Sequence, residues 1–413
     1  MKTSYIKLPT GLFFLLASLA AYASEAPFMA TAVVTDGSGL PAVIASGSNF
    51  QDFTTNITEV SGQFQGFSGH SYNSNVTFLG VPNAILYSTN NTGTVVTMKL
   101  TPIGFAMTFT GTSKDDVKTQ INNFFEKNGA GILASFLKAV SQTSPIAVTD
   151  GNPNAATAVA ANSVFLSAAM TPATDVADQA AGAKPQFGGL ALGFDTGGFT
   201  AGSFSGNNYD LSLTALNIGF GDRVRLQVPV DFNYLTVSGA KVGGAGVTFV
   251  LPIRISIMDQ NNPLNWRLIP LAGVNARASV DLAGGAALWE AGAISSVDFK
   301  VSPKLVLCLM DQYTLNKSFS IKEGSYSFNP QVNQGILKNG VRFVTPLTKR
   351  VILDCFVVET NFINAAEIKN FTTVGACLSL RATKSYNLSI AGNYDTGTAF
   401  KSWSVGLTSA WHW

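Results

Sequence analysis

Apolar and polar residues alternate with a period of two over most of the second half of the chain. The clearest run covers residues 224–234, where six apolar positions alternate with five mostly polar ones. Successive side chains of a strand point to opposite faces, so this run predicts a strand with one apolar face. Strands of soluble sheets usually end after about 5 or 6 residues. A run of 11 residues instead suits a tilted strand that spans a bilayer, which needs about 9 to 11.

The same alternation recurs throughout residues 186–413 and predicts about twelve antiparallel strands. Several segments carry Trp, Tyr or Phe at their ends, as two membrane interfaces would favour. Residues 305–310 and 351–358 are apolar on both faces, which blurs the period and leaves ten or fourteen strands open. The twelve expected strands begin near residues 187, 208, 224, 243, 265, 286, 305, 333, 350, 370, 386 and 402.

The pattern differs before residue 186. Residues 24–112 are rich in Gly, Asn and Thr and contain short alternating runs, which predict strands. The period changes at Ser113, which forms a helix-starting pattern with Asp116. Apolar residues then recur at helical spacing in two segments between residues 113 and 141, which predict two amphipathic helices.

A third helix is expected to start at Asn152-Pro153 and to stop before Pro172, with residues 172–185 as an irregular lead into the strands. Residues 24–185 therefore predict a small α+β domain that plugs the barrel or lies in the periplasm. Two alternatives stay open: a linker threaded through the barrel lumen, and extra barrel strands within residues 29–110.

The first 23 residues predict a secretory signal peptide. Lys2 and Lys7 are the charges there, Leu12–Ala21 form an apolar core, and Ala21-Tyr22-Ala23 is a small-x-small cleavage site. The expected division of the chain is thus a signal peptide over 1–23, an α+β region over 24–185 and a barrel over 186–413.

Composition supports a barrel. Only 12% of the residues are charged, whereas soluble proteins average about 25%. Beyond the predicted signal peptide, no run approaches the roughly 18 to 20 apolar residues of a spanning helix. The signal peptide carries two of the 26 basic residues, which leaves 24 against 24 acidic ones and predicts no attraction to nucleic acid. The expected fold class is an all-β transmembrane barrel with a smaller N-terminal α+β region.

Side chains suited to catalysis are scarce. The chain has two histidines, His70 and His412, and three cysteines without a CxxC spacing. Since His412 falls within the last expected strand, His70 alone would have to serve a triad or a zinc site. We therefore expect no enzymatic activity, cofactor or metal, and a membrane-embedded hydrolase that uses His70 is a minor alternative.

The end of the chain resembles the C-terminal assembly signal of Gram-negative outer-membrane β-barrels. Trp403, Val405, Leu407, Trp411 and Trp413 share one parity, and the chain ends on the last of them; Ser409 departs from the pattern. The resemblance implies residence in the outer membrane, contact with its lipid bilayer, and recognition of the final strand by the barrel-assembly machinery. It names a class of proteins and no family within it.

A barrel of about twelve strands is intermediate in bore, so some narrowing or plugging is expected. The predicted function is a channel or transporter for small solutes. The alternative is an autotransporter-like translocator or surface-display protein with residues 24–150 as its passenger. Sequence leaves the solute, the gating and the oligomeric state open. The candidate pore-lining residues, all on the polar parity, are Arg225, Asp231, Arg254, Arg267, Arg277 and Asp298.

Overall fold

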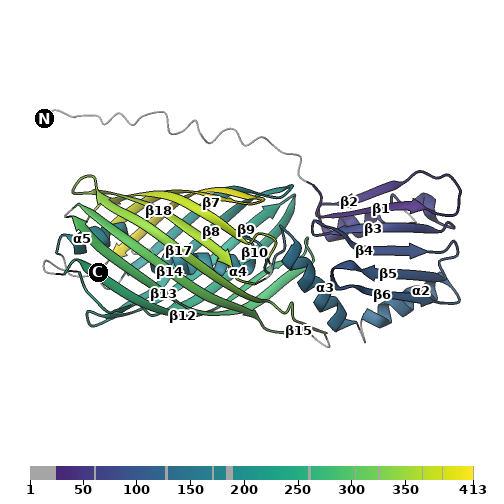
Figure 1. Ribbon diagram of the computed structural model, residues 1–413, viewed down its shortest axis with the longest axis horizontal. Coiled ribbons are helices and arrows are strands. Elements are labelled where there is room, and N and C mark those ends of the chain that lie inside the picture. The colour runs from purple at the N-terminus through teal and green to yellow at the C-terminus, as the bar shows by residue number, and fades with distance from the viewer. Residues whose placement is uncertain are drawn as a thin grey trace, which may run out of the picture.

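The computed structural model places a six-stranded sheet domain against one end of a long β-barrel (Figure 1). It describes residues 25–59, 62–125, 129–169, 172–182, 189–258, 262–302, 304–323, 326–364, 366–383 and 385–412. The predicted signal peptide and Trp413 lie outside these residues, and the expected boundary at residue 185 falls in an undescribed stretch, so these stay predictions.

The barrel is a closed antiparallel sheet of twelve strands. Each strand pairs with its neighbours along the chain, and the last strand pairs with the first from Phe400↔Ala201 to His412↔Gly189. One barrel strand is interrupted at Leu251-Pro252 and is therefore labelled as two pieces, β10 and β11. The strands are β7 (Gly189–Ala201), β8 (Phe204–Phe220), β9 (Val224–Val237), β10 (Ala240–Val250), β11 (Ile253–Arg254), β12 (Leu264–Ser279), β13 (Gly284–Ser302), β14 (Leu305–Ser318), β17 (Asn333–Pro346), β18 (Val351–Phe362), β19 (Asn370–Arg381), β20 (Tyr386–Gly397) and β21 (Phe400–His412).

The predicted fold class and strand number are confirmed. Each of the twelve strands begins within four residues of its expected start, including the less regular ones expected near residues 187, 305 and 350. A short hairpin, β15 (Ile321–Glu323) and β16 (Tyr326–Phe328), lies in the connection between β14 and β17 and is not part of the barrel.

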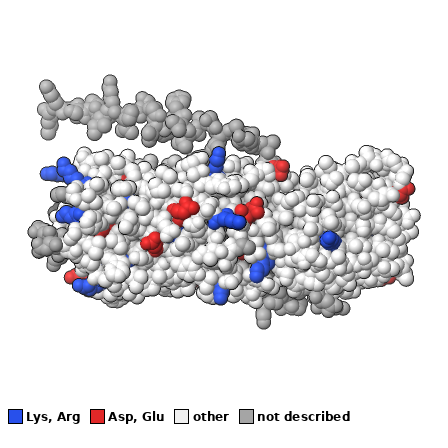
Figure 2. Space-filling model, viewed as in Figure 1, with Lys and Arg blue, Asp and Glu red and all other residues white. Residues whose placement is uncertain are grey.

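The outer surface of the barrel is apolar and carries two aromatic belts. On β21, Trp403 and Trp411 both point outward, paired across the sheet with Tyr394 and Tyr386. They are eight residues apart in sequence, which spans roughly 20 Å of barrel height for a strand tilted by about 40°. This height is close to that of the apolar band of outer-membrane barrels, about 25 Å. Figure 2 shows few charged residues on this face.

The N-terminal domain is a separate antiparallel sheet with strand order β2-β1-β3-β4-β5-β6. Its strands pair with one another, so the alternative that residues 29–110 supply extra barrel strands is wrong. Ser113 caps α2 as predicted, because its side-chain oxygen accepts from the N–H of Asp116 at 3.1 Å. The elements are β1 (Phe28–Val34), β2 (Val43–Gly47), α1 (Phe50–Asn56), β3 (Tyr72–Phe78), β4 (Val81–Thr89), β5 (Val95–Leu100), β6 (Phe105–Thr110), α2 (Lys114–Asn123) and α3 (Ala130–Thr143), with 3₁₀ turns at Gln65–Phe67 and Thr101–Ile103.

The domain is docked on one mouth of the barrel through a shared apolar core. This core contains Phe28 and Phe78 from the domain and Phe204, Val237 and Leu282 from the barrel rim. The N–H of Phe50 also donates to the carbonyl of Asp281 at 2.7 Å. We call this end the domain mouth. The opposite end, where β7 begins and β21 ends, we call the terminal mouth.

Two further helices lie inside the barrel: α4 (Ala156–Val164), continued by a π-helical turn at Phe165–Ala169, and α5 (Ala173–Ala180) (Figure 1). The sequence placed the first helical residue at Pro153, but the helix starts after Ala155. The expectation of an irregular lead over 172–185 is wrong for α5. Packing against the barrel wall stabilises this short helix, which sequence alone would not support. Among the described residues, no helix combines the length and apolarity needed to span a membrane.

Candidate functional site

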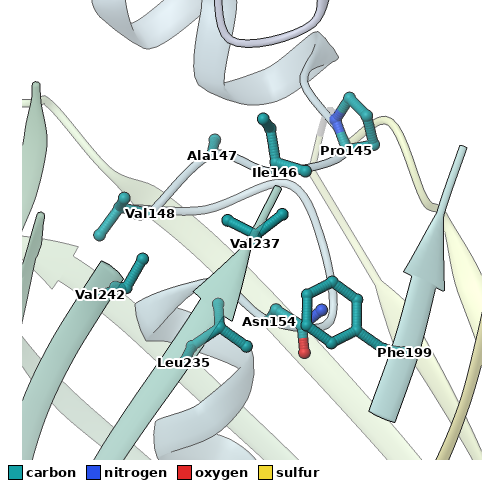
Figure 3. Close-up of a pocket in the computed structure, with 9 residues that line it drawn as sticks. All are labelled: Pro145, Ile146, Ala147, Val148, Asn154, Phe199, Leu235, Val237 and Val242. Atoms are coloured by element: carbon teal, nitrogen blue, oxygen red, sulfur yellow. The ribbon is translucent and has the colours of Figure 1, made fainter. Parts of the chain in front are cut away.

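The candidate site is the barrel lumen, through which the chain itself passes. After α3, the loop from Pro145 to Ala155 enters the domain mouth (Figure 3). There Ile146 and Val148 lie beside Leu235 and Val242 of the barrel around a cavity of about 230 Å³. The chain then runs along the lumen as α4 and α5 and reaches the terminal mouth. We call residues 156–180 the lumenal segment.

Apolar contacts hold the lumenal segment against one side of the barrel. Val164 and Phe165 are buried in a cluster with inward-facing residues of β10, β12, β13, β14 and β18. Ala173, Val176 and Ala180 are buried against inward-facing residues of β14, β17 and β18. These contacts explain why residues 305–310 and 351–358 are apolar on both faces: one face meets lipid and the other meets a helix.

Polar contacts fix the position of the segment along the lumen. The Ser163 hydroxyl donates to Asp231 Oδ1 at 3.2 Å, and Gln312 Nε2 donates to the Ala161 carbonyl at 2.9 Å. Near the terminal mouth, Arg381 Nη2 lies 2.6 Å from Asp178 Oδ1. Contacts of this kind occur from the middle of α4 to the end of α5, so the wall matches the segment over its length.

The other side of the lumen is accessible to solvent. Several inward-facing residues of β7, β8, β20 and β21 are half-buried or exposed, although the inward glycines Gly193, Gly197 and Gly406 on these strands are buried. The inward residues of β12 to β18 are mostly buried. On the lumenal segment, Asn162 is exposed and Leu166 is 41% exposed. At the domain mouth this space ends at buried aromatic residues, Phe199, Phe204 and Phe400. We call the solvent-accessible residues on these strands the accessible wall: Asp195, Ser212, Ser389, Ser404 and Thr408.

All six charged residues predicted to line the pore face the lumen, and the structure brings four of them together. Arg225, Arg254 and Arg267 line one cavity of about 370 Å³ near the terminal mouth. Asp298 accepts from Arg267 Nη2 at 3.4 Å and from Asn265 Nδ2 at 2.7 Å. Whether these residues line a path for solutes stays a prediction.

Asp231 and Arg277 lie elsewhere, deeper in the lumen. Both are buried, and Asp231 contacts α4 through Ser163. Gly244 and Gly246 of β10 lie opposite Asn233 and Asp231 on β9, and both glycines face these polar side chains. A side chain added at Gly246 would collide with Asn275, so the glycine on β10 leaves room for the Asn275 side chain.

The sequence reasoning missed the most buried ion pair. Arg342 contacts Asp354 through two bonds, Nε to Oδ1 at 2.9 Å and Nη2 to Oδ2 at 2.7 Å. It also missed Lys338, whose ammonium donates to Asn162 and Thr360. Both basic residues share the inward parity with Ile336 and Val344, which hid them within an apolar pattern. The signal that could have found the pair was Asp354, the single charge in residues 351–358.

The histidine considered for catalysis, His70, lies in the N-terminal domain. His70 Nδ1 lies 2.9 Å from Asp36 Oδ2 in the N-terminal domain, and this contact lowers the pKa of the Asp36 carboxyl. The three cysteines carry free thiols. Within the described part of the chain, no group of three or more His, Cys, Asp or Glu side chains is arranged to hold a metal ion.

A closed β-barrel with an apolar outer surface and aromatic belts is the architecture of outer-membrane β-barrel proteins. Solved structures similar to this chain belong to that class. The translocator domain of the autotransporter NalP from Neisseria meningitidis is 12% identical, with 62% of this chain and 98% of that chain covered and a TM-score of 0.42. An outer-membrane channel from Pseudomonas putida F1 is 14% identical, with 56% of this chain and 97% of that chain covered and a TM-score of 0.41. The NanC porin is 12% identical, with 52% of this chain and 98% of that chain covered and a TM-score of 0.33.

No protein-family profile matches the sequence, and no curated protein is similar to it in sequence. At these identities the likeness to solved structures lies in the fold, and the strand pairing of the chain itself establishes the barrel.

Proposed function

We propose that this chain is an outer-membrane protein that passes small solutes through its barrel, along the accessible wall and beside the lumenal segment. The observation that carries the proposal is the unequal filling of the lumen. The lumenal segment packs on one side of the barrel, whereas the accessible wall on β7, β8, β20 and β21 is half-buried or exposed to solvent. Ser212, Ser389, Ser404 and Thr408 are small and polar, as the lining of an aqueous path requires.

The proposed passage is gated, because the buried aromatic residues of the domain mouth close the solvent-accessible space at that end. Phe371 and Phe400 stack edge to face at 5.6 Å, and both belong to the core shared with the N-terminal domain. Opening requires movement of the domain or of the lumenal segment. The proposal includes no catalytic step.

Planar-bilayer recording of the full chain tests the proposal with a matched pair of variants. Thr408 belongs to the accessible wall and faces the lumen, and the next residue, Ser409, faces outward. We expect Thr408→Trp to reduce the current of each opening and Ser409→Trp to leave it unchanged. Absence of any current at all voltages, or equal currents in the two variants, would refute passage along the accessible wall.

A second candidate function, display of residues 24–150 outside the cell, is supported by the path of the chain. The domain covers one mouth, while the barrel begins and ends at the other, so the lumenal segment joins opposite sides of the membrane. The longest connection, between β14 and β17, is also at the domain mouth, and longer loops are typically extracellular. Protease added to intact cells would cleave the exposed loop at residues 36–40 if the domain is outside. Cleavage that needs permeabilised cells would place it in the periplasm.

A further inference from the structure

We infer that the cavity lined by Arg225, Arg254 and Arg267 binds a small oxyanion, such as phosphate or a short carboxylate. The three arginines come from β9, β11 and β12, and Ser167 and Pro172 of the lumenal segment also line the cavity. It lies near the terminal mouth, close to the turn at Gly221–Arg223.

The first argument is the placement of like charges. Arg254 and Arg267 are directly opposite each other on β11 and β12, and both are more than 90% buried. Like charges at directly opposed positions of a sheet destabilise it, more so away from water. Arg225 extends the same cluster, since its N–H donates to the carbonyl of Pro252, two residues before Arg254.

The second argument is the charge balance around the cavity. Among the described residues, Asp298 accepts from Arg267, and the buried Asp175 of α5 also lies near the cluster. An anion in the cavity would add negative charge between the arginines and reduce the repulsion between Arg254 and Arg267.

The third argument is the chemistry of the donors. A guanidinium presents planar pairs of N–H groups that match two oxygens of a carboxylate or phosphate. Gln227 lines the same cavity and adds an amide as a further donor. This donor set favours an anion with several oxygens over a halide.

Thermal unfolding of the detergent-purified full chain, at fixed ionic strength, tests the inference with phosphate, acetate and chloride as separate probes. We expect phosphate or acetate to raise the melting temperature along a saturating curve, because a ligand that binds only the folded state stabilises it. Chloride should act at most weakly. Arg254→Gln should weaken the apparent affinity roughly tenfold or more, and Arg254→Lys, which keeps the charge but loses the paired donors, should fall between.

Arg277→Gln is the matched control. Arg277, on β12, is buried as Arg254 is, but it does not line the cavity. This variant should lower basal stability and keep the response to phosphate. The inference is overturned if no oxyanion gives a saturating shift in the native chain, or if Arg254→Gln and Arg277→Gln respond alike, which would mark a general salt effect. The role of this binding rests on the proposed passage of solutes, but the two proposals can fail separately. A chain without conductance could still show the phosphate response, and a chain without the phosphate response could still conduct.

Discussion

Phe165 holds the lumenal segment in place, and its replacement by alanine should release that segment. The Phe165 side chain is 1% exposed and packs near Gly340, where the ring edge lies 3.3 Å from the position of a Cβ atom. The Lys338 ammonium lies 5.5 Å from the ring centroid. Removing a fully buried Phe costs about 3–5 kcal/mol, and loss of the cation–π contact adds about 0.5–2 kcal/mol.

Leu166 is the matched control because it is the next residue and faces the solvent-accessible side of the lumen. At 41% exposed, its truncation should cost only about 1 kcal/mol. The difference of about 2.5–6 kcal/mol corresponds to roughly 60- to 20,000-fold in the ratio of released to docked segment, since about 1.4 kcal/mol is a factor of ten.

Single-channel recording in planar bilayers measures this ratio as the frequency of large openings. Phe165→Ala should open far more often than the native chain, and Leu166→Ala should stay near it. Heat-modifiable gel mobility confirms that both variants keep the barrel. If the two variants open equally often, or if neither differs from the native chain, the lumenal segment is not the element that limits passage.

Two further predictions concern buried charge. Breaking the Arg342–Asp354 pair by Arg342→Met should destabilise the barrel by about 3–5 kcal/mol, whereas Arg342→Met with Asp354→Leu should recover most of the loss; equal stability of the single and double variants in urea titrations would contradict this. Burial raises the pKa of Asp150, in the loop that enters the domain mouth, so the folded chain binds this proton more tightly than the unfolded chain and stability is lost as pH rises through the folded pKa. Asp150→Asn should therefore raise the melting temperature at pH 8, with a gain that vanishes below the unfolded pKa of about 4; a gain independent of pH would show that ionisation is not its cause.

The barrel could be predicted from sequence because lipid imposes one rule on every strand. Outward positions must be apolar, so Val224–Tyr234 keeps its period whatever lies inside. The inward parity obeys no such rule. On β12, Ile269 and Leu271 interrupt the polar parity because they face the lumen and pack against Val164 and Phe165. Their apolarity was a signal for a helix inside the barrel.

The lumenal cavity could be predicted only in part. Arg225, Arg254 and Arg267 were selected because they are charged residues on inward positions, and parity is a local property of each strand. Their convergence depends on the register Arg254↔Arg267, which continues unchanged from β10 across the interruption at Leu251-Pro252. Register between strands is decided by pairing across the whole barrel, and a single sequence does not reveal it. Arg277 lies apart because it is ten residues beyond Arg267 on the same strand.

The two sides of the lumen meet different physical requirements, and this division is what lets one barrel both hold a segment and leave a path. On the packed side, apolar contacts supply the binding energy of the helices, and buried pairs such as Arg342–Asp354 contribute position more than stability, because their desolvation offsets most of their attraction. On the accessible side, small polar residues keep contact with water and attract no helix. A lumenal segment amphipathic in the opposite sense would expose Phe165 to water and bury Asn162. The orientation of α4 is therefore fixed by the wall, and the proposed path for solutes depends on that orientation.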